Sequence, residues 1–204
     1  MNEKTKYYYN DLPEGYEKDY VIDAKDKKFT IVYGIILNFV LIALTITLCL
    51  VIKGASINEY KDFIANNYLF SMVSLIVFAL ALLAYIILHE LTHGLFYKLL
   101  THEKLTFGLT LTVAYCGIPT IYCKKIPAII TLLAPFITFT LAFGIPLFFI
   151  NNLLIYLLLS IILGIHVGGC IGDLYGTIII LFKYHGKNIL INDTGPKQTF
   201  YIKK

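Results

Sequence analysis

The feature that most constrains this chain is a run without charged side chains over residues 126–172. A helix needs roughly 20 apolar residues to cross a hydrocarbon core of about 30 Å. The run is too long for one crossing, and the polar pair Asn151-Asn152 is where we expect the chain to turn back. The run therefore predicts two membrane-spanning helices, at about residues 127–150 and 153–182.

Two further apolar stretches, at about residues 31–52 and 69–97, are also long enough to cross a membrane. Over the whole chain 58% of residues are hydrophobic and 15% are charged, whereas soluble domains have about 25% charged residues. We therefore predict an all-α integral membrane protein with four transmembrane helices. A membrane domain of residues 30–182 would lie between a leader, 1–29, and a tail, 183–204.

The lysines indicate how the chain is oriented. The chain has 17 lysines and no arginine, and fifteen of the lysines lie in the leader, in the segment 98–125 or in the tail. Only Lys53 and Lys61 lie elsewhere. Positively charged segments remain in the cytoplasm, so the chain is predicted to be a multi-pass protein of the cell membrane with both termini cytoplasmic. This asymmetry accounts for the net charge of +4 without a nucleic-acid partner.

The segment after the second apolar stretch changes its pattern. Apolar and small or polar residues alternate over 105–115, which is the period of a β-strand. Gly117 and Pro119 can turn the chain, and residues 120–123 can return as a second strand. We therefore expect a short β-hairpin at about 104–123, on the cytoplasmic surface of the membrane.

The two ends of the chain carry weaker signals. The leader holds seven acidic residues and six lysines, with a turn signal at residues 12–16. It is expected to be either a small ordered cytoplasmic segment or a loose one. The tail is polar, with a turn signal at residues 193–196.

A possible metal motif lies in the second apolar stretch, where residues 89–93 read His-Glu-Leu-Thr-His. Helical spacing places His89 and His93 on one face, one turn apart, where both imidazoles can bind one Zn²⁺. Glu90 beside them can take a proton from water. It follows 27 residues without a charge, and a carboxylate in an apolar helix costs about 2.5–3.5 kcal/mol. The alternative is a helix end whose two histidines reach the membrane surface.

Asp173 is the expected third ligand, because it is the only acidic residue in the last two spans. Asp173 and His89 each lie 20 residues after the expected start of their helix, and the two helices run in the same direction, so both reach the same depth. The alternative is an aspartate that reaches for cytoplasmic water. Gly164, Gly168 and two further glycines at the same spacing of four residues are expected to let the second helix approach the fourth; Gly94 would join this contact.

Two other polar residues are candidates. His166 lies two turns before Asp173, where it would orient a ligand, bind substrate or stabilise an oxyanion, or else be a hydrogen-bonded packing histidine. Asn38, near the cytoplasmic end of the first helix, is a candidate for the same substrate or oxyanion role.

With these motifs the chain resembles the putative zincin peptidase family of small bacterial membrane proteins, which are similar to site-two proteases. The resemblance rests on Leu12-Pro13-Glu14-Gly15-Tyr16, His89-Glu90-Leu91-Thr92-His93-Gly94, Ala134-Pro135 and Gly168-Gly169-Cys170-Ile171-Gly172-Asp173. It implies that His89, His93 and Asp173 bind zinc and that Glu90 is the catalytic acid and base. In site-two proteases a glycine follows the aspartate at this place, whereas in this chain Leu174 follows Asp173.

These features together predict an intramembrane zinc metallopeptidase that cuts membrane proteins or peptides near the cytoplasmic face. The substrate would have to be unwound, and the hairpin would hold it by adding a strand to an open edge. The alternative from another class is a non-catalytic protein, either a metal-binding regulator or a small ion transporter whose His and Asp residues line an ion path. The sequence does not identify the substrate or the oligomeric state.

Overall fold

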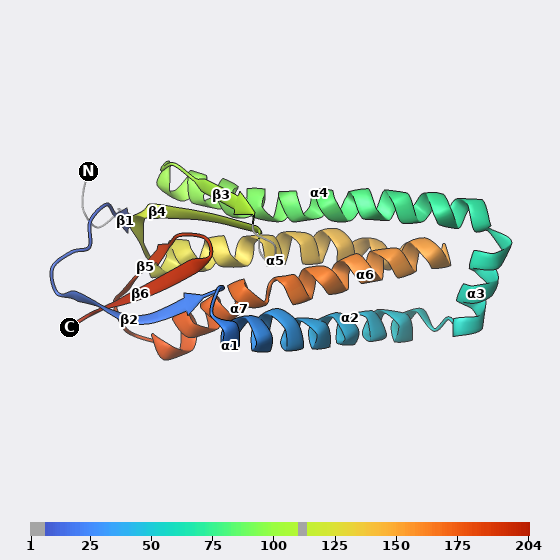
Figure 1. The fold of residues 1–204 in the computed structure, drawn as a ribbon, viewed down its shortest axis with the longest axis horizontal. Helices are drawn as coiled ribbons and strands as arrows, with labels where there is room; N and C mark the ends of the chain where they lie inside the picture. The colour runs from blue at the N-terminus through green and yellow to red at the C-terminus, as the bar shows by residue number, and fades with distance from the viewer. Residues whose placement is uncertain (1–6, 110–113) are drawn as a thin grey trace.

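The structure is a computed structural model, and it describes residues 7–109 and 114–204. Long helices run side by side along the molecule, and a β-sheet closes one end (Figure 1). The helix α3 (Ile57–Asn66) lies at the opposite end. A capping box formed by Ser56 and Glu59 starts this short helix.

The first span is one helix over Lys27–Lys53, made of α1 (Lys27–Phe29), η2 (Thr30–Leu37) and α2 (Asn38–Lys53). The helix begins where the Asp26 carboxylate accepts a hydrogen bond from the backbone N–H of Phe29 at 2.9 Å. It ends at Gly54, whose φ of 71° is favourable only for residues such as glycine.

The next helices are α4 (Tyr68–Thr101), α5 (Lys125–Leu147) and α6 (Leu153–Gly169). The expected turn at Asn151-Asn152 is confirmed, because the Asn152 side chain caps α6 by accepting from the N–H of Ile155. Among the described residues, three helices are long and apolar enough to cross a membrane, and a fourth span results if a bent pair is counted as one.

Apolar side chains cover the outside of this bundle. Leu44, Leu48 and Leu80 are each at least 60% exposed, and they are three of many exposed large hydrophobic residues on α2 and α4. A soluble protein rarely exposes such a continuous apolar surface. The helices are therefore compatible with a membrane protein.

The fourth span is not the single helix expected over 153–182. It is α6 followed by α7 (Ile171–Ile178) and η3 (Ile179–Lys183), with a bend of 40° at Cys170. Gly168, Gly169 and Gly172 surround the break, and glycine is a poor residue for a helix interior. The bend therefore has a local cause in the sequence.

The expected glycine contact is also different. A Cβ on Gly168 would lie 2.4 Å from Oδ1 of Asn38, and one on Gly164 would lie 3.2 Å from the carbonyl oxygen of Ile42. These glycines therefore face α2 of the first span. The predicted contact of Gly164 and Gly168 with the second span is not observed. Gly94 faces the ring of Phe107 in the hairpin, 2.7 Å from its ideal Cβ.

The prediction of a helical fold with one short hairpin is confirmed only in part, because a six-stranded antiparallel sheet closes one end of the bundle. Within the described residues its strands are β1 (Tyr8–Tyr9), β2 (Tyr16–Asp23), β3 (Thr106–Leu109), β4 (Ala114–Lys124), β5 (Ile189–Asp193) and β6 (Lys197–Lys203). The order is β1-β4-β5-β6-β2, with β3 paired to β4. The leader, the hairpin and the tail thus form one sheet.

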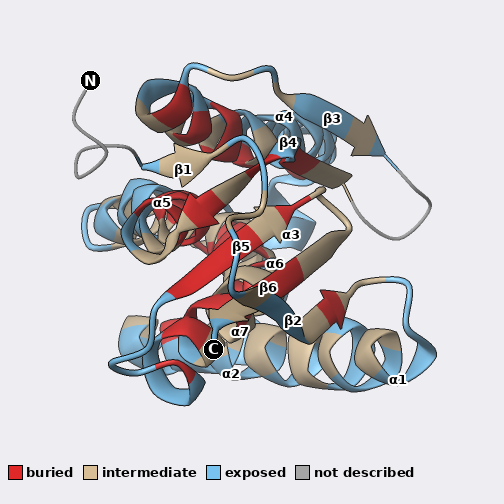
Figure 2. Ribbon diagram, turned by 90° about the vertical axis from the view of Figure 1, so that its left-hand side faces the viewer, coloured by how far each residue is buried: buried red, intermediate tan, exposed pale blue. Residues whose placement is uncertain are grey.

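Buried residues of this sheet concentrate in β4, β5 and β6 (Figure 2). Ile118, Ile121, Tyr184, Leu190 and Phe200 are each at most 1% exposed. The leader is ordered over β2, and the tail is a packed hairpin and not only a polar segment. Strand β2 pairs with β6 from the other end of the chain, a contact that no local pattern predicts.

The hairpin does not turn at Gly117 and Pro119, as was expected. Both residues lie inside β4, and Leu109 pairs with Ala114. Residues 110–113, which hold part of the alternating pattern, lie outside the described residues. Pro119 is tolerated in β4 because the pairing of β4 with β5 is irregular between Ile118 and Cys123.

Gly117 is required by a close approach of the tail. A Cβ on Gly117 would lie 2.3 Å from the backbone nitrogen of Gly195. We expect Gly117→Ala to lower the free energy of unfolding by about 1–3 kcal/mol, because backbone must move to make room. Gly144→Ala is the matched control, since its Cβ meets nothing within 4 Å and alanine favours helix. Thermal unfolding in detergent measures both, and equal midpoints would contradict the close packing.

Candidate functional site

The helix α4 and the helix α7 bring three predicted ligands together. His89 and His93 lie on one face of α4 and are 8% and 5% exposed. The Oδ2 atom of Asp173, in the first turn of α7, lies 3.5 Å from Nε2 of His89 and 3.3 Å from Nε2 of His93. The predicted meeting of the second and fourth spans is therefore present in the structure.

The chemistry of this donor set fits zinc. One ligand atom from each of His89, His93 and Asp173 lies within 4.8 Å of the others. Two imidazole nitrogens and one carboxylate oxygen are ordinary zinc ligands, and three protein ligands leave a fourth position for water or substrate. A set of three protein ligands is typical of catalytic zinc sites, whereas closed structural sites have four.

Pro135 in α5 helps to orient His93. Because proline has no N–H, the carbonyl of Thr131, four residues earlier, loses its helical hydrogen-bond partner. That carbonyl accepts a hydrogen bond from Nδ1 of His93 at 2.9 Å. A proton on Nδ1 leaves the lone pair of His93 on Nε2, the atom that faces Asp173.

Glu90, the fourth residue of the predicted site, lines the same cavity as the three ligands, which has a volume of about 140 Å³. This space holds a few water molecules, each of which takes about 30 Å³. The backbone N–H of Cys116 in β4 is a hydrogen-bond donor to the Glu90 carboxylate. Glu90 therefore lies where it can exchange a proton with water beside the ligands.

The tail also lines this cavity, which the sequence did not predict. Asp193, Gly195, Pro196 and Gln198, from β5, β6 and the turn between them, belong to its lining. A turn at 193–196 was visible in the sequence, but its position against the site depends on distant strand pairing. The structure shows that the tail packs over this part of the site.

Asp193 ties this turn to α4. Its Oδ2 accepts from the hydroxyl of Tyr97 at 2.6 Å, and its Oδ1 accepts from the N–H of Gly195 at 2.8 Å. Burial raises the pKa of Asp193 to about 6, against the lowering effect of these two hydrogen bonds.

Asn38 lies near the predicted site. It lines a second cavity, of about 350 Å³, together with His89 and Glu90. Its Oδ1 is close to Gly168, as described above. Its role toward a substrate remains a prediction.

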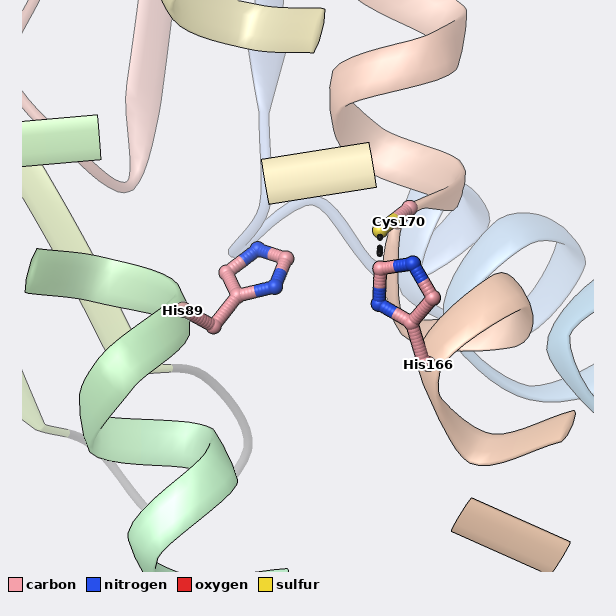
Figure 3. A group of neighbouring side chains, drawn as sticks. All are labelled: His89, His166 and Cys170. Carbon is pink, nitrogen blue, oxygen red and sulfur yellow. Dashed lines mark hydrogen bonds between the residues drawn. The ribbon is translucent and has the colours of Figure 1, made fainter. Parts of the chain in front are cut away.

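His166 is completely buried and is not among the lining residues of either cavity. It lies between α4 and the break in the fourth span, with Cys170 beside it (Figure 3). The Sγ atom of Cys170 is 3.6 Å from Nδ1 of His166. His89, His166 and Cys170 form a second group whose ligand atoms lie within 4.8 Å of one another. No sequence motif predicted a ligand role for Cys170.

The sequence model of one protein family, described as putative zincin peptidase, matches residues 82–187, more than half of the chain. The chain belongs to this family. The match contains His89, Glu90, His93 and Asp173 and ends before β5. Membership of this family supports the assignment of the chain as a zinc-dependent metallopeptidase. No curated protein and no solved structure matched the chain.

The first test of the site is its metal content. We expect about one zinc per chain in the purified protein, and loss of that zinc in His89→Ala and in Asp173→Ala, because two remaining ligands hold zinc weakly. The matched control is His185→Ala, since His185 is exposed and distant in sequence from the motif. Elemental analysis of the protein in detergent measures the ratio. Zinc that survives both ligand changes would contradict this site.

Proposed function

We propose that the protein is an intramembrane zinc metallopeptidase that hydrolyses membrane proteins or peptides near the cytoplasmic face. The observation that carries this proposal is the meeting of His89, His93 and Asp173 with Glu90 at one cavity. His89, Glu90 and His93 lie on a helix that is long and apolar enough to span a membrane, and Asp173 lies in the bent pair of helices that meets this test when counted as one. Charged groups at such positions are costly and usually serve a function.

In this proposal Nε2 of His89, Nε2 of His93 and a carboxylate oxygen of Asp173 hold the metal. Bound zinc supplies a Lewis acid, which lowers the pKa of water toward about 7 and polarises the scissile carbonyl. Glu90 takes the proton from the attacking water and passes it to the leaving amine. The Cys116 N–H donates to the ionised Glu90 carboxylate, the form that takes up the proton.

A substrate approaches this site from the side of the hairpin. A mainly apolar cavity of about 650 Å³ lies between α4 and the hairpin, and Glu90 is part of its wall. Its apolar lining includes Leu83, Ile87, Leu91 and Phe107. Among the described residues β3 pairs with β4 alone, so its other edge is available for an unwound peptide to add a strand.

The proposed orientation is supported by where the lysine-rich segments lie. The leader, the hairpin and the tail meet in the sheet at one end, whereas α3 lies at the other (Figure 1). The sheet end would face the cytoplasm. This places the metal ligands near the cytoplasmic surface, where water reaches them.

Cysteine labelling tests the orientation. The native cysteines are buried, so the wild-type protein is the control for background. In intact cells we expect a membrane-impermeant maleimide to label Asp62→Cys in α3 but not Lys187→Cys before the tail strands, since both positions are exposed and lie at opposite ends. Labelling of Lys187→Cys from outside would reverse the topology.

The change Glu90→Gln separates a peptidase from a metal-binding regulator or transporter. We expect the variant to keep its zinc, because Glu90 is not a ligand, and to cut at least about 10²-fold more slowly, because glutamine cannot carry the proton. The assay reconstitutes the protein with a library of transmembrane peptides and counts new N-termini by mass spectrometry. Equal cleavage by the variant, or no cleavage by the zinc-loaded wild-type protein, would contradict the proposal.

A further inference from the structure

His166 is a buried titratable residue that the proposed reaction does not use. It is 0% exposed, and both of its ring nitrogens have hydrogen-bond partners. Nε2 lies 3.2 Å from the carbonyl oxygen of Phe136 and 3.1 Å from the hydroxyl of Thr140. Nδ1 lies 2.9 Å from the hydroxyl of Tyr85. Such a complete set of partners fixes the position of the proton.

The partner on Nε2 determines the direction of these bonds. A carbonyl oxygen only accepts, so the hydrogen between Nε2 of His166 and Phe136 lies on Nε2, and the Thr140 hydroxyl, which can donate or accept, is then a second acceptor for it. Nδ1 of the neutral ring is then an acceptor, and the hydroxyl of Tyr85 donates to it.

Tyr85 passes this direction on to His89. The Tyr85 hydroxyl has one hydrogen, and it donates this hydrogen to Nδ1 of His166. Its oxygen therefore accepts a hydrogen bond from Nδ1 of His89 at 3.2 Å. His89 therefore carries its proton on Nδ1, and Nε2, the atom beside Asp173, would offer its lone pair to a metal bound between them. The opposite direction would bring two acceptors together at the Phe136 carbonyl and would put a hydrogen on Nε2 of His89, where a metal must bind.

We infer that Tyr85 and His166 are positioning residues. They form a chain of hydrogen bonds from the Phe136 carbonyl to Nδ1 of His89, called the relay below, which holds His89 in its metal-binding tautomer. The inference rests on the proposed zinc site. His93 reaches the same tautomer directly through the Thr131 carbonyl. Both ligand histidines thus have their protons fixed by backbone carbonyls of α5.

A second metal on His89, His166 and Cys170 is the rival explanation for this cluster. It would need the Nδ1 lone pair of His166, which already accepts from Tyr85 at 2.9 Å. The hydroxyl would have to leave before a metal entered. The relay needs no such movement, and Cys170→Ser separates the two explanations, because the relay predicts unchanged metal content.

The test measures the dissociation constant for Zn²⁺ of the full-length protein in detergent, by competition with a chromogenic chelator. We expect Tyr85→Phe and His166→Leu to bind zinc about 10–100-fold more weakly, which is the usual effect of losing a hydrogen bond to a metal ligand. His166→Asn should stay within a few-fold of the wild-type protein, since its amide oxygen takes the place of Nδ1 as the acceptor for Tyr85.

Tyr156→Phe is the matched control for a buried tyrosine. Tyr156 is 3% exposed and donates to the carbonyl of Cys49 at 2.7 Å, far along the bundle from the ligands. It should lose stability without losing zinc affinity. Equal loss of affinity in Tyr156→Phe and Tyr85→Phe, or wild-type affinity in Tyr85→Phe, would overturn the relay.

Nitrogen-15 NMR of the histidine-labelled wild-type protein tests the relay without a variant. The expected tautomers are Nε2–H for His166 and, with Zn²⁺ added, Nδ1–H for His89. A His166 ring protonated on Nδ1 alone would overturn the inference. If the wild-type protein binds no zinc, the proposed function fails, whereas the tautomer of His166 still decides the direction of the relay.

Discussion

The structure depends on bringing one carboxylate to two imidazoles inside a bundle of apolar helices. An unpaired carboxylate in such surroundings is costly, and the cost falls when a metal or hydrogen-bond donors lie opposite it. Asp173 meets this condition only because α7 places it against the face of α4 that carries His89 and His93. The bend at Cys170 and the close packing of Gly168 on α2 both lie within one or two turns of Asp173. The bend and the Gly168 contact therefore both affect where Asp173 lies relative to α4.

The helix α5 carries none of the three proposed ligands, yet its backbone carbonyls contact His93 directly and, in the inferred relay, orient His89. Pro135 frees the carbonyl of Thr131 for His93, and the next residue, Phe136, offers its carbonyl to His166. A proline in a helix is usually described as a kink. Here its missing N–H has a second consequence, because an unused backbone acceptor in a dry environment is available to a side chain. The Ala134-Pro135 pair thus contributes to the site through backbone groups.

The sequence predicted the parts of this site that follow from local spacing. Predicting that His89 and His93 share a helix face, and that His89 and Asp173 lie at equal depth, required only the geometry of a helix. The pairing of β2 with β6, the helix that Gly164 and Gly168 contact, and the tail in the cavity depend on residues far apart in the chain. The sequence patterns of these segments are compatible with several pairing or packing partners. The turn of the hairpin was misplaced because Gly117 was interpreted as a turn residue, whereas it is small in order to admit the backbone of the tail.

The tail gives the site a wall that lies beyond the family match. Residues 82–187 include the proposed metal ligands and Glu90, whereas Asp193, Gly195 and Gln198 follow them in the chain and line the same cavity. The ligands determine which reaction is possible, and the walls determine which peptide fits beside them. Because the tail turn is held by Tyr97 of α4 and by the close contact with Gly117, it is a fixed part of the cavity. Under the proposed function, selection among substrates would depend on residues 193–198 as well as on the helices that carry the proposed ligands.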